Sequence, residues 1–216
     1  MQSMSVGLAA VSTSDPLFQQ YATYYGNPTY ADSFVLGALA TTMNTTPQAR
    51  AQFAQLVFIV TSLWMYTVHE LTTSLSTCQQ NIPFTQGDHG SAPLEEAWAF
   101  YTGSLEGPRR DYTHNGYLLF ALADSLCAVL STCLPSLKMS IINSKNLAVF
   151  SEAQSCGLDG LCSMLSDSIS EIKQQLRTVL VQGLVQHMWE ADTSSSFAGR
   201  YLAYVHVLLQ SYHNKV

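Results

Sequence analysis

The chain has 216 residues, of which 11 % are charged, and its net charge is −6 at pH 7. This length suits a single domain with a sizeable core, but an ordinary soluble domain carries roughly 25 % charged residues. The composition argues against nucleic-acid binding, because no basic cluster is present that could neutralise phosphates. Ser, Thr, Gln and Asn supply the polarity, which indicates either a glycosylated extracellular protein or a subunit covered by its neighbours.

Helix signals recur along the whole chain and predict an all-α protein. Asp15-Pro16 and Thr46-Pro47 each place a capping side chain before a proline at the first helical position, and Gly107 marks a helix end. No segment shows the alternation with a period of two that a half-buried strand requires. In chain order we expect helices at about 16–25, 29–43, 47–79, 93–106, 115–133, 143–155, 158–191 and 195–213.

Two of these helices, 47–79 and 158–191, are much longer than the others. They suggest two related helical hairpins, packed as one bundle or as a pair of bundles. We therefore expect a single all-helical domain over 1–216, with two pseudo-repeated halves at about 15–106 and 115–213. The apolar run Leu56–Val68 is shorter than the roughly 18 to 20 residues that span a bilayer, so it predicts a buried core helix and no membrane span.

The five cysteines form no Cys-x-x-Cys pair, which argues against a zinc or thioredoxin-type site. Cys156 and Cys162 lie across a glycine turn, where a short disulfide is geometrically easy, and Cys127 and Cys133 flank a helix end. Free buried thiols are the alternative. Asn44 begins an Asn-x-Thr sequon in a predicted loop, which indicates glycosylation and an oxidising, secretory compartment.

Two segments carry candidate metal ligands. His187 and Glu190 are three residues apart and project from one helix face, a spacing that helical bundles use to hold a metal. The segment EEAWAFYTGSLEG adds Glu96, Tyr101 and Glu106, whose carboxylate and phenolate oxygens are hard ligands that suit Fe(III). The alternative is an exposed polar face in the first segment, and core aromatics with solvated glutamates in the second.

Catalytic motifs are missing from the sequence. No nucleophile elbow, phosphate loop or dinucleotide fingerprint occurs, and no serine has a local His and Asp. His69 and Glu70 are adjacent, so their side chains point about 100° apart and do not easily share one ion. We therefore expect a protein that is not an enzyme.

The chain resembles the low-iron-inducible periplasmic proteins of algae, relatives of the phytotransferrins, in four segments. In chain order these are YYGNPTYADSFVLGAL, EEAWAFYTGSLEG, NGYLLFALADSLCAVLSTC and QQLRTVLVQGLVQHMWEAD. The resemblance implies a helical domain that is secreted, periplasmic or on the cell surface and that captures ferric iron, with a synergistic anion. It also implies that Cys127 and Cys133 belong to a recurring cysteine-bearing helix end.

Two functions are therefore expected from the sequence. The first is an extracellular or periplasmic iron-assimilation domain, and it is favoured because EEAWAFYTGSLEG keeps all its acids. The alternative is a structural, non-catalytic subunit of an extracellular or organelle-lumen assembly, which keeps the fold without the metal site. The low charge favours this alternative, as do Ser125 and Leu126, which stand where the family resemblance implies a basic pair.

Overall fold

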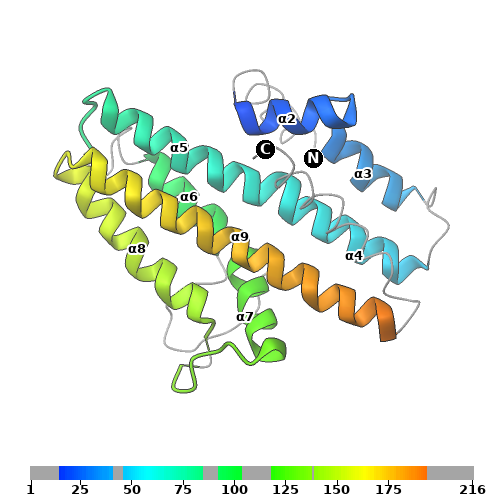
Figure 1. Cartoon of the computed structure of the whole chain (residues 1–216). Coiled ribbons are helices and arrows are strands. Elements are labelled where there is room, and N and C mark those ends of the chain that lie inside the picture. Colours follow the sequence, from blue (N-terminus) through cyan, green and yellow to red (C-terminus); the bar gives the residue numbers. More distant parts are fainter. Residues whose placement is uncertain (1–14, 41–45, 85–91, 104–117, 138, 194–216) are drawn as a thin grey trace. The chain divides into compact units, whose positions relative to one another are not determined.

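The computed structural model describes residues 15–40, 46–84, 92–103, 118–137 and 139–193. Every element of regular structure in these ranges is a helix (Figure 1), so the all-α prediction is confirmed. The elements are α2 (Pro16–Tyr25), α3 (Tyr30–Leu39), α4 (Pro47–Phe58), the π-helical η1 (Ile59–Trp64), α5 (Met65–Gln79), α6 (Ala92–Thr102), α7 (Leu119–Leu130), α8 (Ile141–Leu158) and α9 (Cys162–Thr193).

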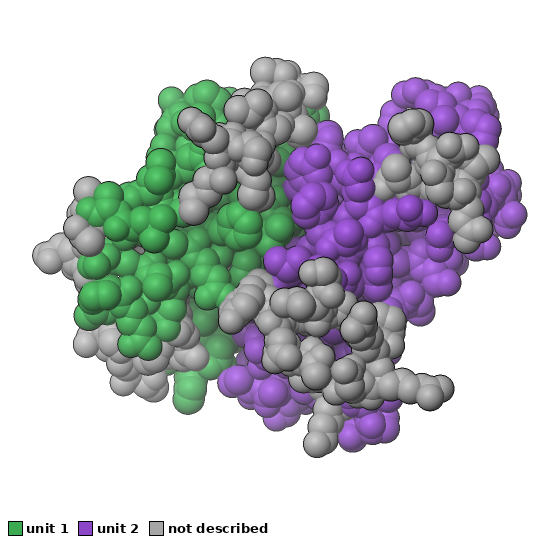
Figure 2. Space-filling model, turned by 180° about the vertical axis from the view of Figure 1, so that it is seen from behind, with its two compact units in different colours: residues 1–65, 184–216 green, residues 66–183 purple. Residues whose placement is uncertain are grey.

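The chain divides into two compact units, which Figure 2 colours separately. One unit comprises residues 1–65 and 184–216, and the other comprises residues 66–183. These units do not coincide with the predicted halves at 15–106 and 115–213. The boundaries between the units fall after residue 65 and after residue 183, inside the two long helical stretches. The predicted boundary fell in the loop between the halves.

The first unit contains a cluster of stacked tyrosines. Helix α2 begins at Asp15, whose carboxylate accepts hydrogen bonds from the backbone nitrogens of the next turn, and it ends at Gly26 with a φ of 64°. The rings of Tyr25 and Tyr30 stack with centroids 5.3 Å apart, and the Tyr30 hydroxyl donates to the Met65 sulfur at 3.1 Å. Burial in this cluster raises the pKa of Tyr25 to about 12. The cluster therefore joins α2 and α3 to Met65, the first residue of α5.

The predicted helix 47–79 is present, but a π-helical segment interrupts its hydrogen-bonding pattern. All six residues of η1 are buried, and the Thr61 hydroxyl donates to the Val57 carbonyl at 2.6 Å. The stretch Pro47–Gln79 is long and apolar enough to cross a membrane by length and composition, yet 56 % of its most apolar window is buried inside the protein. Burial of this kind is typical of a core helix; that Leu56–Val68 does not span a membrane stays a prediction.

In the second unit, α6 packs on α7, and α7 packs on α8. Helix α6 ends at Thr102, before Gly103, and not at Gly107 as the sequence predicted. Gly103 adopts a φ of 74°, and its backbone nitrogen donates to the Ala99 carbonyl at 2.7 Å, which closes the helix. A Cβ added there would lie 2.7 Å from Leu118 Cδ1, so this helix end requires glycine.

Two disulfides lie within the second unit. Cys127 and Cys133 are bridged, in agreement with the prediction, but Cys162 is bridged to Cys78 with a Cα–Cα distance of 5.7 Å. The predicted Cys156–Cys162 bridge is therefore wrong, and Cys156 is a free thiol on the buried face of α8. Cys162 instead begins α9 beside the last turn of α5. Both bridges fit an oxidising environment, while the predicted glycosylation site Asn44 lies outside the described residues.

The two disulfides should differ in their effect on stability. Replacing Cys78 and Cys162 together by Ser should lower the free energy of unfolding by about 2–4 kcal/mol, because this bridge joins residues 84 positions apart. Replacing Cys127 and Cys133 should cost less, because they are six positions apart. Urea unfolding of both double variants measures the difference, and an equal or larger loss for the short bridge would contradict the prediction.

Candidate functional site

The side chains of α6 point to different neighbours, and this helix therefore organises the candidate site. Glu95 and Trp98 are three residues apart and share one side of the helix, where they line a pocket. Tyr101 is fully buried. Glu96 follows Glu95 by one residue and so lies about 100° around the helix. Helix α6 thus contributes two residues to the pocket, one residue to the core, and a second carboxyl group on another side.

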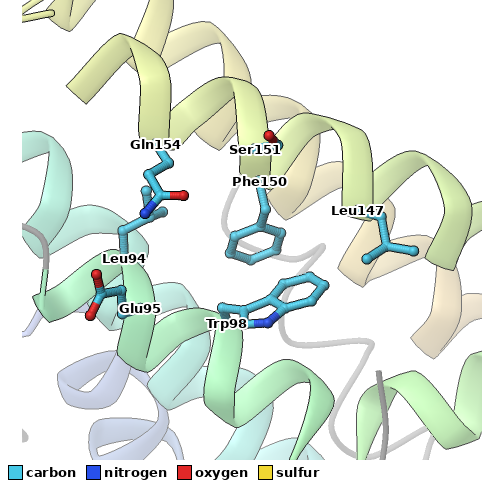
Figure 3. A pocket seen from close by; sticks show the side chains of 7 residues that line it. All are labelled: Leu94, Glu95, Trp98, Leu147, Phe150, Ser151 and Gln154. Atoms are coloured by element: carbon cyan, nitrogen blue, oxygen red, sulfur yellow. The ribbon is translucent and has the colours of Figure 1, made fainter. Parts of the chain in front are cut away.

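Helices α6 and α8 form the walls of a pocket of about 270 Å³ within the second unit (Figure 3). Trp98 and Phe150 occupy its middle, with ring centroids 5.0 Å apart in a T-shaped arrangement. Glu95 and Gln154 lie at one end and Leu147 lies at the other. The full lining consists of Leu94, Glu95, Trp98, Leu147, Phe150, Ser151 and Gln154. A mainly apolar wall with a few polar groups is typical of small-molecule sites.

Aromatic contacts connect this pocket to the core. Phe150 stacks on Tyr101 with centroids 6.1 Å apart and planes 16° apart, and Trp98 packs on the same tyrosine at 5.9 Å. Tyr101 in turn meets the edge of Phe120 from α7 at 5.8 Å. Each such pair contributes about 0.5–1.5 kcal/mol beyond its buried area. Trp98 and Phe150, which form the aromatic wall of the pocket, are therefore held in place by their packing on Tyr101.

A buried polar network centred on Asn143 lies behind this aromatic wall. The Asn143 side-chain oxygen accepts a hydrogen bond from the Tyr101 hydroxyl. Its amide nitrogen donates to the Phe120 carbonyl at 2.9 Å and to Asp124 Oδ1 at 2.7 Å. The same Asp124 oxygen accepts from the backbone nitrogen of Ser140, the residue that caps α8. One side chain thus connects α6, α7 and the start of α8.

The phenol of Tyr101 stays neutral at physiological pH. Burial raises the pKa of Tyr101 above its ordinary value, the amide of Asn146 opposes the rise, and the Asp124 charge adds to it. Asn146 is itself fully buried, and its amide makes no hydrogen bond of good geometry in the described part of the chain. Tyr101 therefore acts in this structure as a hydrogen-bond donor inside the core.

Glu96 lies close to a second, buried carboxyl group on α5. Burial raises the pKa of Glu70, and the Glu96 charge raises it further, while His69 and a hydrogen bond with Tyr66 lower it. The ring of Tyr66 packs edge-on against Phe100 of α6 with centroids 4.6 Å apart. This contact holds the two helices together beside the pair of carboxyl groups.

The five predicted metal ligands fall in different parts of the chain. Glu106 and the side chain of Glu190 lie outside the described residues. His187 is buried in the first unit, whereas Glu96 and Tyr101 belong to the second. Among the described residues, no group of three or more His, Cys, Asp or Glu side chains could hold a metal ion. The shared ferric site therefore stays a prediction.

Helix α8 contributes to the site, although its sequence predicted no functional residue. Leu147, Phe150 and Gln154 recur at three- and four-residue spacing, which places them on one helix face and could have indicated a lining. Asn143 lies one further turn back on α8, but its partners come from α6 and α7. Periodicity along one helix carries no signal for such a network.

Loss of the Asn143 side chain should destabilise the protein strongly. Asn143→Ala should lower the free energy of unfolding by about 2–4 kcal/mol, because it leaves the hydrogen-bonding groups of Tyr101 and Asp124 without this partner in the core. The comparison is Asn146→Ala, an equally buried asparagine of α8 that also lies near Tyr101 but whose side-chain amide makes no hydrogen bond of good geometry among the described residues. Urea unfolding of the two variants measures the difference, and equal losses would show that the network is not the source.

The buried Glu70 should make stability depend on pH. Since its pKa is raised on folding, the folded chain binds more protons than the unfolded chain above about pH 4, and stability falls as the pH rises. Glu70→Gln should therefore raise the melting temperature at pH 7, and this gain should disappear below about pH 4. Thermal unfolding between these pH values tests the prediction, and a lower melting temperature at pH 7 would contradict it.

Comparison with protein-family models, with curated proteins and with solved structures finds no match to this chain. The resemblance to the algal iron-assimilation proteins therefore stands on the sequence segments alone. One of those segments, EEAWAFYTGSLEG, contributes Glu95 and Trp98 to the pocket and Tyr101 to the core. The function of the chain is accordingly inferred from the geometry of this site.

Proposed function

We propose that this chain is a non-catalytic binding domain that holds a small organic ligand in the pocket between α6 and α8. The observation that carries the proposal is the pocket itself, about 270 Å³ in volume and lined by seven side chains. Four of these side chains are apolar, and Trp98 and Phe150 lie at its centre (Figure 3). Its size is close to the lower end of the range for small-molecule sites.

The apolar lining supplies the driving force for binding. Trp98 and Leu147 are half-buried, so an apolar ligand would remove further parts of both side chains from water. Each square ångström of apolar surface removed contributes roughly 25 cal/mol. Phe150 is already held by its stacking on Tyr101, so little side-chain ordering is needed when the ligand binds.

The polar lining residues suit binding better than catalysis. Glu95, Ser151 and Gln154 offer hydrogen-bonding groups at the pocket. The seven described lining residues include no His, Cys or Lys, which are the usual bases and activated nucleophiles apart from carboxylates. The two disulfides support a site of action in an oxidising compartment, such as outside the cell, in a periplasm or in an organelle lumen.

Ferric-iron capture is the second candidate function. The observation in its favour is the buried carboxyl group of Glu70, whose pKa is raised by burial and further by the charge of Glu96 on the facing helix α6. Carboxylate oxygens are hard ligands that suit Fe(III). A calorimetric titration with Fe(III), with and without carbonate, tests this candidate independently of the pocket. A purely structural subunit is the outcome if neither ligand class binds.

Filling the pocket should abolish binding without unfolding the chain. Ser151→Phe places a ring in the pocket from an exposed position of α8, and it should weaken the binding of small aromatic fragments at least about tenfold. Titration followed by NMR measures the dissociation constants of aromatic fragments that carry neutral, cationic and anionic head groups.

The matched control is Ser170→Phe, which adds the same ring at an exposed position of α9 outside the lining. This variant should bind as the natural chain does. Equal binding by the Ser151→Phe chain would place the ligand elsewhere. Failure of every fragment to bind the natural chain would overturn the proposed function.

A further inference from the structure

We infer that the ligand of this pocket is an amphiphilic organic cation, with an ammonium group beside Glu95 and an apolar body along Trp98 and Phe150. The inference rests on the proposed binding function and adds the chemical class of the ligand. It is motivated by the distribution of charge along the pocket, which has a polar end and an apolar end (Figure 3).

The charge of the lining favours a positive head group. Glu95 is the one charged residue among the seven described lining residues, and Gln154 lies at the same end of the pocket (Figure 3). A carboxylate accepts hydrogen bonds only, and the Gln154 side-chain oxygen adds another acceptor. An anionic head group would be repelled there. A neutral apolar group would remove water from Glu95 without replacing it.

The aromatic side chains favour the same class of ligand. Trp98 follows Glu95 by three residues, so the indole and the carboxylate lie on one side of α6. In Figure 3 the Glu95 carboxylate points away from the indole, so the indole belongs to the apolar part of the pocket and contacts the body of the ligand. Beyond the indole, Phe150 and Leu147 offer only apolar surface to the rest of the ligand (Figure 3). The ligand must accordingly combine a positive end with an apolar body.

Glu95 also has a structural role that the experiment must separate from binding. It lies in the first turn of α6, where the helix dipole stabilises a carboxylate whether or not a ligand is present. Removing its charge will therefore affect folding as well as recognition. Glu96 supplies the matched control, because it is also exposed and carries the same charge on the next residue, but does not line the pocket.

Three probes of the same shape separate the head-group charges: 2-phenylethylamine, 2-phenylethanol and 3-phenylpropionate. At neutral pH the natural chain should bind the amine at least about fivefold more tightly than the alcohol, which corresponds to one exposed ion pair with Glu95. The propionate should bind most weakly. NMR titration of each probe gives the three dissociation constants.

The variants assign this preference to Glu95. Glu95→Gln should abolish the preference for the amine and leave the affinity for the alcohol unchanged, whereas Glu96→Gln should keep the preference. Glu95→Asp keeps the charge and should retain most of the preference. Retention in this variant would show that the loss in Glu95→Gln comes from the missing charge and not from altered folding. Thermal unfolding of each variant confirms that the compared chains are folded at the temperature of the titration.

Each remaining outcome has a distinct meaning. Equal affinity of the natural chain for the amine and the alcohol would overturn the inferred ligand class but leave the proposed binding function standing. Equal loss of preference in Glu95→Gln and Glu96→Gln would also overturn it, because net charge alone would then explain the preference. Failure of all three probes to bind the natural chain would remove the proposed function together with the inference.

Discussion

The buried amide of Asn143 is the interaction on which the candidate site depends. A buried amide must have its hydrogen bonds satisfied, because an unpaired polar group in the core costs about 1–3 kcal/mol. Asn143 meets this requirement only if Tyr101 of α6 and Asp124 of α7 lie at fixed positions around it. Phe150 lies two helical turns further along α8 and stacks on the same Tyr101. The hydrogen bonds in the core thus fix the aromatic wall of the pocket.

Helix α6 explains why a chain so poor in charge places acidic and aromatic residues side by side. The aromatic residues of this helix pack on three other helices, because successive positions turn by about 100°. Trp98 packs on Phe150 of α8, Phe100 packs on Tyr66 of α5, and Tyr101 packs on α7 and α8. The described acids precede these rings in the first turns of α6, where Glu95 lines the pocket and the charge of Glu96 acts on Glu70 of α5. The helical part of this segment, residues 95–102, therefore makes packing contacts with three other helices.

Local signals in the sequence predicted the helices well, because caps, prolines and apolar periodicity act within one turn of the chain. They failed where a distant residue decides the outcome. Cys162 has a close neighbour in Cys156, but its partner Cys78 is 84 residues away. Gly103 and Gly107 are equivalent as helix stops by sequence, yet the packing of Leu118 against the first occurs only in the folded chain. The Asn143 network has the same origin, since each of its partners lies on another helix.

The low charge of the chain gives each carboxylate more influence on its surroundings. With 9 Lys and Arg against 15 Asp and Glu, few cationic side chains are available to neutralise the acids. A carboxylate beside apolar and aromatic walls is also screened less by water than one on an open surface. Glu95 is exposed, so in the proposed complex it acts on the ligand as a single charge at the edge of the pocket. Burial raises the pKa of Glu70, and the Glu96 charge adds to the rise, while His69 opposes it. The composition thus affects the proposed binding through the charges of a few carboxylates, while packing decides where those carboxylates lie.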